Sequence, residues 1–312
     1  MSAATSTRSA ARGFTRQDAR FREWVTADGS SGYAAEPGRY HLYVSLACPW
    51  AHRTLVVRAL KGLQEAIDVS IVDPIRDNRG WAFRDVPGAT GDRLHGWSLL
   101  SEAYVASEPG YDRHVSVPVL WDTRTERIVN NESADIVVML NEAFDAFAAH
   151  PEIDFYPAEL RAEIDALNRV VYETVNNGVY RAGFAPTQED YDEAVHPLFA
   201  TLDRLDERLA SRRHLVGGRP TLADWRLFTT LVRFDAVYVG HFKCNLRRIV
   251  DYPHLSAYLR DLYQTPGVAE TVDMDHIKRH YYLTHGQLNP RAIVPAGPIL
   301  DLDAPHGREA LG

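Results

Sequence analysis

The segment HLYVSLACPW, residues 41–50, joins a predicted strand to a predicted helix. Its first six residues are rich in aromatic and aliphatic side chains, and this composition favours a strand. Apolar residues then recur at helical spacing between Ala51 and Leu63, so we expect a helix there. Pro49 suits the first position of this helix, where its missing N–H costs nothing. The pattern therefore places Cys48 at a strand-to-helix turn.

Further strands follow in the first half of the chain. Residues 67–72 alternate like a strand, whereas residues 73–112 predict a long loop with at most one short helix. Residues 117–122 and 127–130 predict a hairpin, after which a helix runs from Asn131 to about Ala146. The order β-α-β followed by β-β-α is that of a thioredoxin-like domain, with a right-handed crossover between the first two strands.

The second half is predicted to be helical, with helical periodicity at 158–178, 188–212, 222–238 and 252–264. Thr221-Leu222-Ala223-Asp224 has the pattern of a capping box. We therefore expect an α/β domain plus an all-α domain. The predicted parts are an N-terminal arm at 1–36, a thioredoxin-like thiol-binding domain at 37–148, an all-helical domain at 155–280 and an irregular C-terminal extension at 281–312.

Composition narrows the class of protein. The chain has 312 residues, of which 45% are hydrophobic and 24% charged, as in a globular protein of about two domains. A formal net charge of -8 argues against a dedicated nucleic-acid binder, and the lack of any long apolar run excludes a membrane-spanning helix. Only two cysteines are present, and the histidines have no metal-ligand spacing, so we expect neither a disulfide scaffold nor a metal site.

The N-terminus and the cysteine content bear on location. Arg8, Arg12 and Arg16 occur within the first 17 residues without any acidic residue, which superficially resembles a transit peptide. We interpret this stretch instead as a flexible arm, because ragged termini are common. Scarce cysteine fits a reducing compartment, so we expect a cytoplasmic protein.

Cys48 is the residue on which the chemistry is expected to depend. A helix N-terminus lowers the pKa of a cysteine and stabilises the thiolate, the form that attacks disulfides and thioethers. Ala51 occupies the position at which a Cys-x-x-Cys motif would hold a second thiol. We therefore expect monothiol chemistry, in which Cys48 forms a mixed disulfide that an external thiol must release.

Two further motifs each allow two interpretations. A cis Val117-Pro118 bond would expose backbone groups for pairing with an extended peptide, whereas a trans proline would simply begin an edge strand. Glu132-Ser133 opens a helix and could hold an α-amino-carboxylate, or the helix could be capped in the ordinary way by Asn131 or Ser133.

These motifs together resemble the glutathionyl-hydroquinone reductases, the Xi class of glutathione transferases, also called omega-like. The resemblance extends from about residue 14 to the C-terminus. It rests on CPWAHR (48–53), VPVLWD (117–122), NES (131–133), NNGVYRAGFA (176–185), RFDAVY (233–238), HYY (280–282), NP (289–290) and PHGR (305–308). It implies a C-terminal helical domain of the glutathione-transferase type.

The resemblance also implies roles for individual residues. Val117, followed by Pro118, would bind the cysteinyl part of glutathione through its backbone, and Glu132 and Ser133 would hold the γ-glutamyl part. Trp81 would flank the thiol tripeptide. The family often carries a basic residue shortly before the Val-Pro strand, where it meets the glycyl carboxylate. In this chain, both residues of that stretch are candidates, Arg113 and His114.

The catalytic residues implied by the resemblance are a cysteine and two tyrosines. Cys48 would be the nucleophile. Tyr180, together with Tyr281 or Tyr282, would sit at the electrophile pocket and hydrogen-bond the quinol oxygen.

The expected function is reduction of S-glutathionyl-hydroquinones by a homodimer, with glutathione as co-substrate and no permanently bound cofactor. Four alternatives stay open. The thiol could be another one, such as mycothiol, and the reaction could be general thiol transfer or dehydroascorbate reduction. The protein could also be a non-enzymatic ligand carrier, or a conjugating transferase, which would favour Ser or Tyr at the position of Cys48.

Other residues have plainer interpretations. His52 and Arg53 either aid the thiolate or have solvated or capping roles. Asp224 is expected to be a helix cap, and Cys244 a semi-buried residue without a chemical role. The helical aromatic residues Trp225, Phe228 and Phe234 are expected in the core.

Overall fold

The computed structural model describes residues 17–311, so the predictions made for Arg8, Arg12 and Arg16 lie outside the described residues. The first half contains a four-stranded sheet in the order β4-β3-β5-β6. β3 and β4 are parallel, whereas β5 is antiparallel to both of its neighbours. The strands are β3 (Tyr40–Val44), β4 (Ile67–Ile71), β5 (Val119–Asp122) and β6 (Arg127–Asn130). The predicted order of elements is confirmed.

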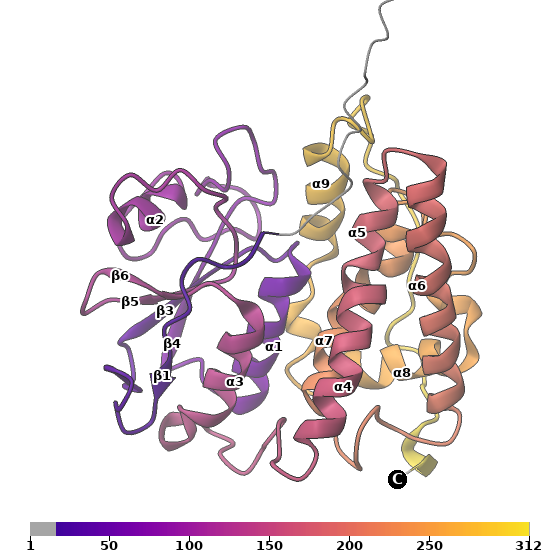
Figure 1. Ribbon diagram of the computed structural model, residues 1–312, viewed down its shortest axis with the longest axis horizontal. Helices are drawn as coiled ribbons and strands as arrows, with labels where there is room; N and C mark the ends of the chain where they lie inside the picture. Colours follow the sequence, from indigo (N-terminus) through magenta and orange to yellow (C-terminus); the bar gives the residue numbers. More distant parts are fainter. Residues whose placement is uncertain (1–16, 312) are drawn as a thin grey trace, which may run out of the picture.

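Two helices connect this sheet to the rest of the molecule. α1 (Pro49–Lys61) and α3 (Ser133–Glu142) pack against each other and lie between the sheet and the C-terminal helices (Figure 1). α3 is shorter than expected, because it ends at Glu142 and a 3-10 turn follows at Asp145–Phe147. The long loop contains one short helix, α2 (Ser101–Ser107), as predicted.

The described part of the predicted arm is packed against the N-terminal domain. β1 (Val25–Thr26) and β2 (Tyr33–Ala34) form a small parallel pair. Phe21 and Val25 are buried in the core. Their burial ties the segment that precedes the sheet to the body of the domain.

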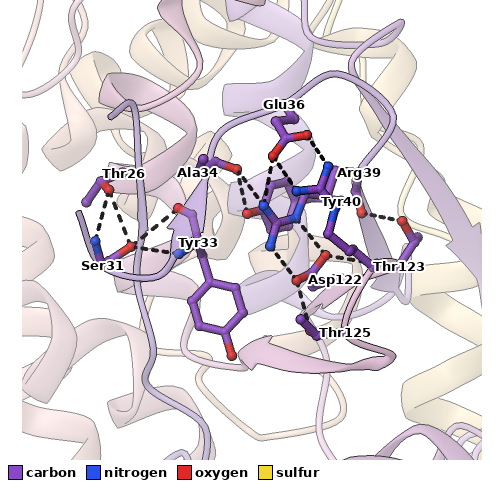
Figure 2. A network of polar contacts seen from close by, with 11 residues as sticks. Thr26, Ser31, Tyr33, Ala34, Glu36, Arg39, Tyr40, Asp122, Thr123 and Thr125 are labelled. Carbon is purple, nitrogen blue, oxygen red and sulfur yellow. Dashed lines mark hydrogen bonds and ion pairs between the residues drawn. The ribbon is translucent and has the colours of Figure 1, made fainter. Parts of the chain in front are cut away.

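Figure 2 shows the polar network that joins this segment to the sheet. The Arg39 guanidinium donates to both carboxylate oxygens of Asp122 at 2.8 Å and to Glu36 at 2.9 Å. The hydroxyl of Tyr40 donates to the carbonyl of Ala34 at 2.7 Å. Burial alone would raise the pKa of Asp122, but the hydrogen bonds it accepts, foremost from Arg39, outweigh burial and keep that pKa below its usual value.

The second half is helical, as predicted. Its helices are α4 (Arg161–Val171), α5 (Gly178–Gly183), α6 (Gln188–Leu209), α7 (Leu222–Arg233), α8 (Pro253–Tyr263) and α9 (Met274–Thr284). One-turn π segments follow α4 at Tyr172–Asn176 and α7 at Phe234–Tyr238. Trp225, Phe228 and Phe234 are buried in the core, as expected. Among the described residues no helix is long and apolar enough to cross a bilayer.

The start of α7 confirms the predicted capping box. The side chain of Thr221 accepts from the N–H of Ala223, and the carboxylate of Asp224 accepts from the N–H of Thr221 at 2.7 Å. Asp224 is fully buried and also accepts from the N–H of Leu215 and the hydroxyl of Tyr258. Asp224 therefore takes part in the capping box and also anchors the beginning of α7 to Leu215 and Tyr258.

The C-terminal boundary needs a correction. Tyr281 and Tyr282 lie inside α9 rather than in an irregular tail, and the irregular segment begins after Thr284. α9 is stabilised by contacts distant in sequence, because His276 and His280 hydrogen-bond the carbonyls of two prolines in the 73–112 loop. The tail then runs along the helical domain (Figure 1).

Candidate active site

Cys48 precedes the first residue of α1, and Pro49 occupies the predicted first helical position. The N–H of Cys48 bonds the carbonyl of Ser45 at 3.1 Å, so the residue sits in a closed turn between β3 and α1. Its side chain is half-buried, and Sγ lies 3.7 Å from the carbonyl oxygen of Val117. The Val117-Pro118 peptide bond is cis, which was one of the two alternatives. The turn that carries the thiol therefore meets the residue that precedes the cis-proline.

Val117 also lines a cavity of about 230 Å³. Six of the predicted binding residues line it: Arg113, His114, Val117, Pro118, Glu132 and Ser133. Arg113 and His114 are both exposed at this cavity, so both remain candidates for a ligand carboxylate. Trp50 and Tyr172 add aromatic surface, and Asp18 and Arg20 come from the segment before the sheet.

The N-terminus of α3 provides an acidic and a hydroxyl side chain at this cavity. Glu132 caps the helix, because its carboxylate accepts from the N–H of Ala134 at 2.9 Å. Neither of the caps considered from the sequence, Asn131 or Ser133, has that role. Ser133 is buried in the first turn, where helix N–H groups favour an anion.

Three tyrosine hydroxyls form a chain between α5, α9 and the π segment after α7. The hydroxyl of Tyr281 lies 2.6 Å from that of Tyr180 and 3.1 Å from that of Tyr238. Burial raises the pKa of Tyr281 and Tyr238 well above the usual value, so both stay protonated. Tyr282 instead donates to the carbonyl of Ala236 at 3.4 Å. Of the two tyrosines left open by the sequence, Tyr281 is the neighbour of Tyr180.

Comparison of this chain with known proteins identifies its family. The family model for the glutathione S-transferase N-terminal domain matches residues 47–143, and that for the C-terminal domain matches residues 188–261. A Xi-class glutathione transferase from Natrialba magadii has a solved structure with a TM-score of 0.92 and 53% identity, covering 96% of this chain and 93% of that one. This chain belongs to the Xi class of glutathione S-transferases.

Two bacterial relatives carry a more specific name. Glutathionyl-hydroquinone reductase YqjG of Escherichia coli is 54% identical over 95% of this chain and 92% of its own length. Its glutathione-bound structure has a TM-score of 0.90 and covers 92% of this chain and 96% of that one. Glutathionyl-hydroquinone reductase PcpF of Sphingobium chlorophenolicum is 52% identical over 95% of this chain and 93% of its own length. The predicted family and the two-domain transferase fold are confirmed.

Of the seven predicted binding residues of this Xi-class chain, Trp81 is the one that does not line the cavity, and the predicted catalytic residues lie outside its lining as well: Cys48, Tyr180, Tyr281 and Tyr282. Trp81 is buried, and its ring stacks on His280 of α9 with centroids 5.1 Å apart. Trp50 is the tryptophan that lines the cavity, where the guanidinium of Arg53 lies 4.4 Å from its ring centroid. The sequence signal for Trp50 was its position in the CPWAHR motif, two residues after the thiol.

The solvated interpretation of His52 and Arg53 is wrong. Both are buried, because the C-terminal helices cover α1. Arg53 donates to the side-chain oxygen of Asn176 at 2.9 Å. Burial, reinforced by the charge of Arg233, holds the pKa of His52 well below its usual value, so the imidazole is neutral.

The remaining cysteine lies apart from this chemistry. Cys244 is fully buried rather than semi-buried, and burial raises the pKa of its thiol, which keeps it protonated. Within residues 17–311, no group of three or more His, Cys, Asp and Glu side chains is placed to hold a metal ion.

Proposed function

We propose that this protein reduces S-glutathionyl-hydroquinones to hydroquinones, with Cys48 as nucleophile and glutathione as reductant. The observation that carries the proposal is the placement of Cys48 at the start of α1 and 3.7 Å from the Val117 carbonyl, in a Xi-class chain. The names of the Escherichia coli and Sphingobium chlorophenolicum relatives support the substrate class.

The glutathione part of the substrate would occupy the cavity lined by the predicted binding residues. The backbone of Val117, which lines this cavity, would pair with the cysteinyl residue, as an added strand pairs with a sheet edge. Glu132 would accept the γ-glutamyl ammonium group, and the N-terminus of α3 with Ser133 would bind its carboxylate. Arg113 or His114 would bind the glycyl carboxylate. The glutathione-bound structure of the Escherichia coli relative supports glutathione as the thiol.

Cys48 would then perform a two-step thiol transfer. Its thiolate attacks the sulfur of the bound conjugate, so an S–S bond forms while the bond from sulfur to the ring carbon breaks. The ring leaves with the electron pair and takes a proton to become the hydroquinone. A second glutathione thiolate attacks the mixed disulfide, which releases glutathione disulfide and restores Cys48. The sum converts the conjugate and one glutathione into hydroquinone and glutathione disulfide.

The tyrosine chain would assist the first step. Attack is easier on the keto tautomer of the ring, because the departing electron pair can then move onto the ring oxygen. If Tyr238 donates to Tyr281 and Tyr281 to Tyr180, the proton of Tyr180 is directed outward, towards that oxygen. A donor at this oxygen stabilises the negative charge that develops there.

The deciding experiment is turnover of a glutathionyl-hydroquinone by purified wild-type, Cys48→Ala and Cys48→Ser proteins, with Cys244→Ala as the matched control. Both substitutions of Cys48 should abolish reduction, because alanine removes the nucleophile and a hydroxyl attacks sulfur poorly. Cys244→Ala should retain it, because this thiol is buried and protonated. Activity of Cys48→Ala above about a hundredth of wild type would overturn the nucleophile assignment.

The proposal extends to the thiol, the assembly and the location. Mycothiol in place of glutathione should fail to release the Cys48 mixed disulfide, which mass spectrometry of the intact protein would detect. We also propose a homodimer, to be tested by light scattering, and a cytoplasmic location, which the scarcity of cysteine supports.

A further inference from the structure

Arg233, the last residue of α7, is a fully buried cation at the boundary between the two halves of the molecule. Within residues 17–311, its hydrogen-bond partners are all neutral groups: three backbone carbonyls and one imidazole. Buried guanidinium groups are ordinarily paired with a carboxylate, because burying a charge without one is costly. A buried arginine held only by neutral acceptors therefore needs a specific explanation.

Two of the carbonyls belong to the turn that carries the nucleophile. Nε of Arg233 donates to the carbonyl of Ala47 at 2.9 Å, and Nη2 donates to that of Leu46 at 2.9 Å. These residues immediately precede Cys48. Nη1 donates to the carbonyl of Thr229, one turn back along α7, at 2.7 Å. Arg233 of the helical half thus holds the strand-to-helix turn of the thioredoxin-like half by two hydrogen bonds.

The fourth partner of Arg233 is the imidazole of His52, and it does not neutralise the positive charge of the guanidinium. Arginine can only donate, so Nδ1 of His52 must accept at 2.9 Å. Nε2 of His52 then carries the proton and donates to Thr271 at 2.8 Å. The imidazole is therefore a neutral acceptor, which agrees with the lowered pKa of His52.

The other titratable groups around this cluster do not neutralise it either. The charge of Arg233 also acts on His280, Tyr238 and Tyr281, but burial lowers the pKa of the histidine to about 4 and raises those of the tyrosines, so all three are uncharged. Two elements packed against each other here carry further charged groups: Arg53 on α1, which donates to Asn176, and Glu132 at the start of α3, which caps that helix.

We propose that Arg233 is a positioning residue for Cys48, which fixes the turn before α1 and stabilises the thiolate through its buried, unneutralised charge. A positive charge in a low-dielectric interior favours a nearby anion more strongly than the same charge does in water. The hydrogen bonds from Arg233 to the carbonyls of Leu46 and Ala47 also keep the Cys48 thiol in one position relative to Val117. The proposal rests on the proposed function only in taking Cys48 as the nucleophile.

The test compares neutral substitutions at two buried arginines. Arg233→Gln and Arg233→Met remove the charge, and the glutamine can still donate to the turn carbonyls. Arg308→Gln is the matched control, because Arg308 is also buried and also donates to three backbone carbonyls, those of Leu209, Arg212 and Arg213. These carbonyls belong to the C-terminal end of α6 and the loop after it, not to the Cys48 turn.

The readout is the rate of alkylation of Cys48 by iodoacetamide across pH, with the modified residue identified by mass spectrometry. Both neutral Arg233 variants should move the midpoint up by about one pH unit or more, which means about tenfold less thiolate at pH values well below both midpoints. Arg308→Gln should keep the wild-type midpoint. An unchanged midpoint in a folded Arg233→Gln protein would overturn the proposal. This readout needs no turnover, so its failure is distinguishable from failure of the proposed function.

Arg233→Lys covers the case in which both neutral variants fail to fold. An ammonium group keeps the charge but cannot present the planar fork that reaches both carbonyls. In Arg233→Lys we expect the alkylation midpoint of Cys48 to stay near that of the wild type. Cys48 of this variant should nevertheless react with glutathione disulfide at least tenfold more slowly. In Arg308→Lys, Cys48 should react at the wild-type rate. A wild-type rate for Arg233→Lys would overturn the positioning role.

Discussion

Replacement of Tyr281 by Phe should separate hydroquinone reduction from disulfide reduction. The hydroxyl of Tyr281 is the middle member of the tyrosine chain, 2.6 Å from Tyr180 and 3.1 Å from Tyr238. Its removal breaks both hydrogen bonds and, in the proposed arrangement, takes away the donor that directs the proton of Tyr180 outward. A hydrogen bond that acts mainly in the transition state is worth roughly 1–3 kcal/mol, so the rate with a glutathionyl-hydroquinone should fall about five- to 150-fold.

The adjacent tyrosine on α9 is the control. Tyr282→Phe loses only a 3.4 Å contact to the carbonyl of Ala236, so we expect less than about a threefold loss of rate. Both variants are assayed with a glutathionyl-hydroquinone and with glutathionyl-mercaptoethanol, which has no phenolic oxygen. Tyr281→Phe should be slow with the first substrate only. Equal losses on the two substrates would show that the tyrosine chain merely packs the boundary between the two halves, and would refute its role at the ring oxygen.

Three further predictions concern stability, each measured by urea unfolding. Asp122→Asn removes the buried carboxylate partner of Arg39, which keeps only the half-buried Glu36, and should cost about 3–5 kcal/mol, whereas Asp68→Asn in the exposed pair with Arg93 should cost under about 1 kcal/mol; equal costs would contradict this. Asp224→Ala strands two buried N–H groups and a tyrosine hydroxyl, so we expect a loss of at least about 3 kcal/mol, and a loss below 1 kcal/mol would argue against its anchoring role. Acid should destabilise the fold, because buried histidines have a folded-state pKa below the unfolded value of about 6.5, so the unfolded chain binds more protons between that pH and about 4. Stability should fall by about 1.4 kcal/mol per proton and pH unit in this window, and an unchanged urea midpoint from pH 7 to 4.5 would refute it. The histidines with a lowered pKa are His41, His241 and His280, at about 4, His285, at about 3, and also His52 and His214.

The sequence predicted those features that local patterns encode. The strand-to-helix turn at Cys48 and the capping box at Thr221 each depend on a few consecutive residues, and the structure has both. The Val117-Pro118 and Glu132-Ser133 motifs also sit at element boundaries, and the structure brings them to one cavity. Such features can be predicted because neighbouring residues set the backbone conformation.

The features that the sequence did not predict depend on contacts between distant residues. For His52 the sequence left open whether it aids the thiolate or has a solvated or capping role, because its partner Arg233 lies 181 positions further along the chain. α9 was missed because loop carbonyls from the first half stabilise it. Its N-cap, Asp273, was the local signal that could have revealed it, since the carboxylate accepts from the N–H of His276.

The two halves make different contributions to the proposed reaction. Cys48 and all six of the predicted residues that line the cavity belong to the thioredoxin-like half, which in the proposed reaction would bind glutathione and exchange disulfides. The tyrosine chain and Arg233 belong to the helical half; Arg233 donates to the turn before Cys48, and in the proposed reaction the tyrosine chain would act on the ring oxygen. Specificity for a hydroquinone conjugate over a simple mixed disulfide should therefore arise at the boundary between the helical half and the thioredoxin-like half. A substitution that loosens this boundary without touching the cavity should reduce hydroquinone turnover more than glutathione binding, because the thiol-binding groups would keep their places while the ring-oxygen donors would not.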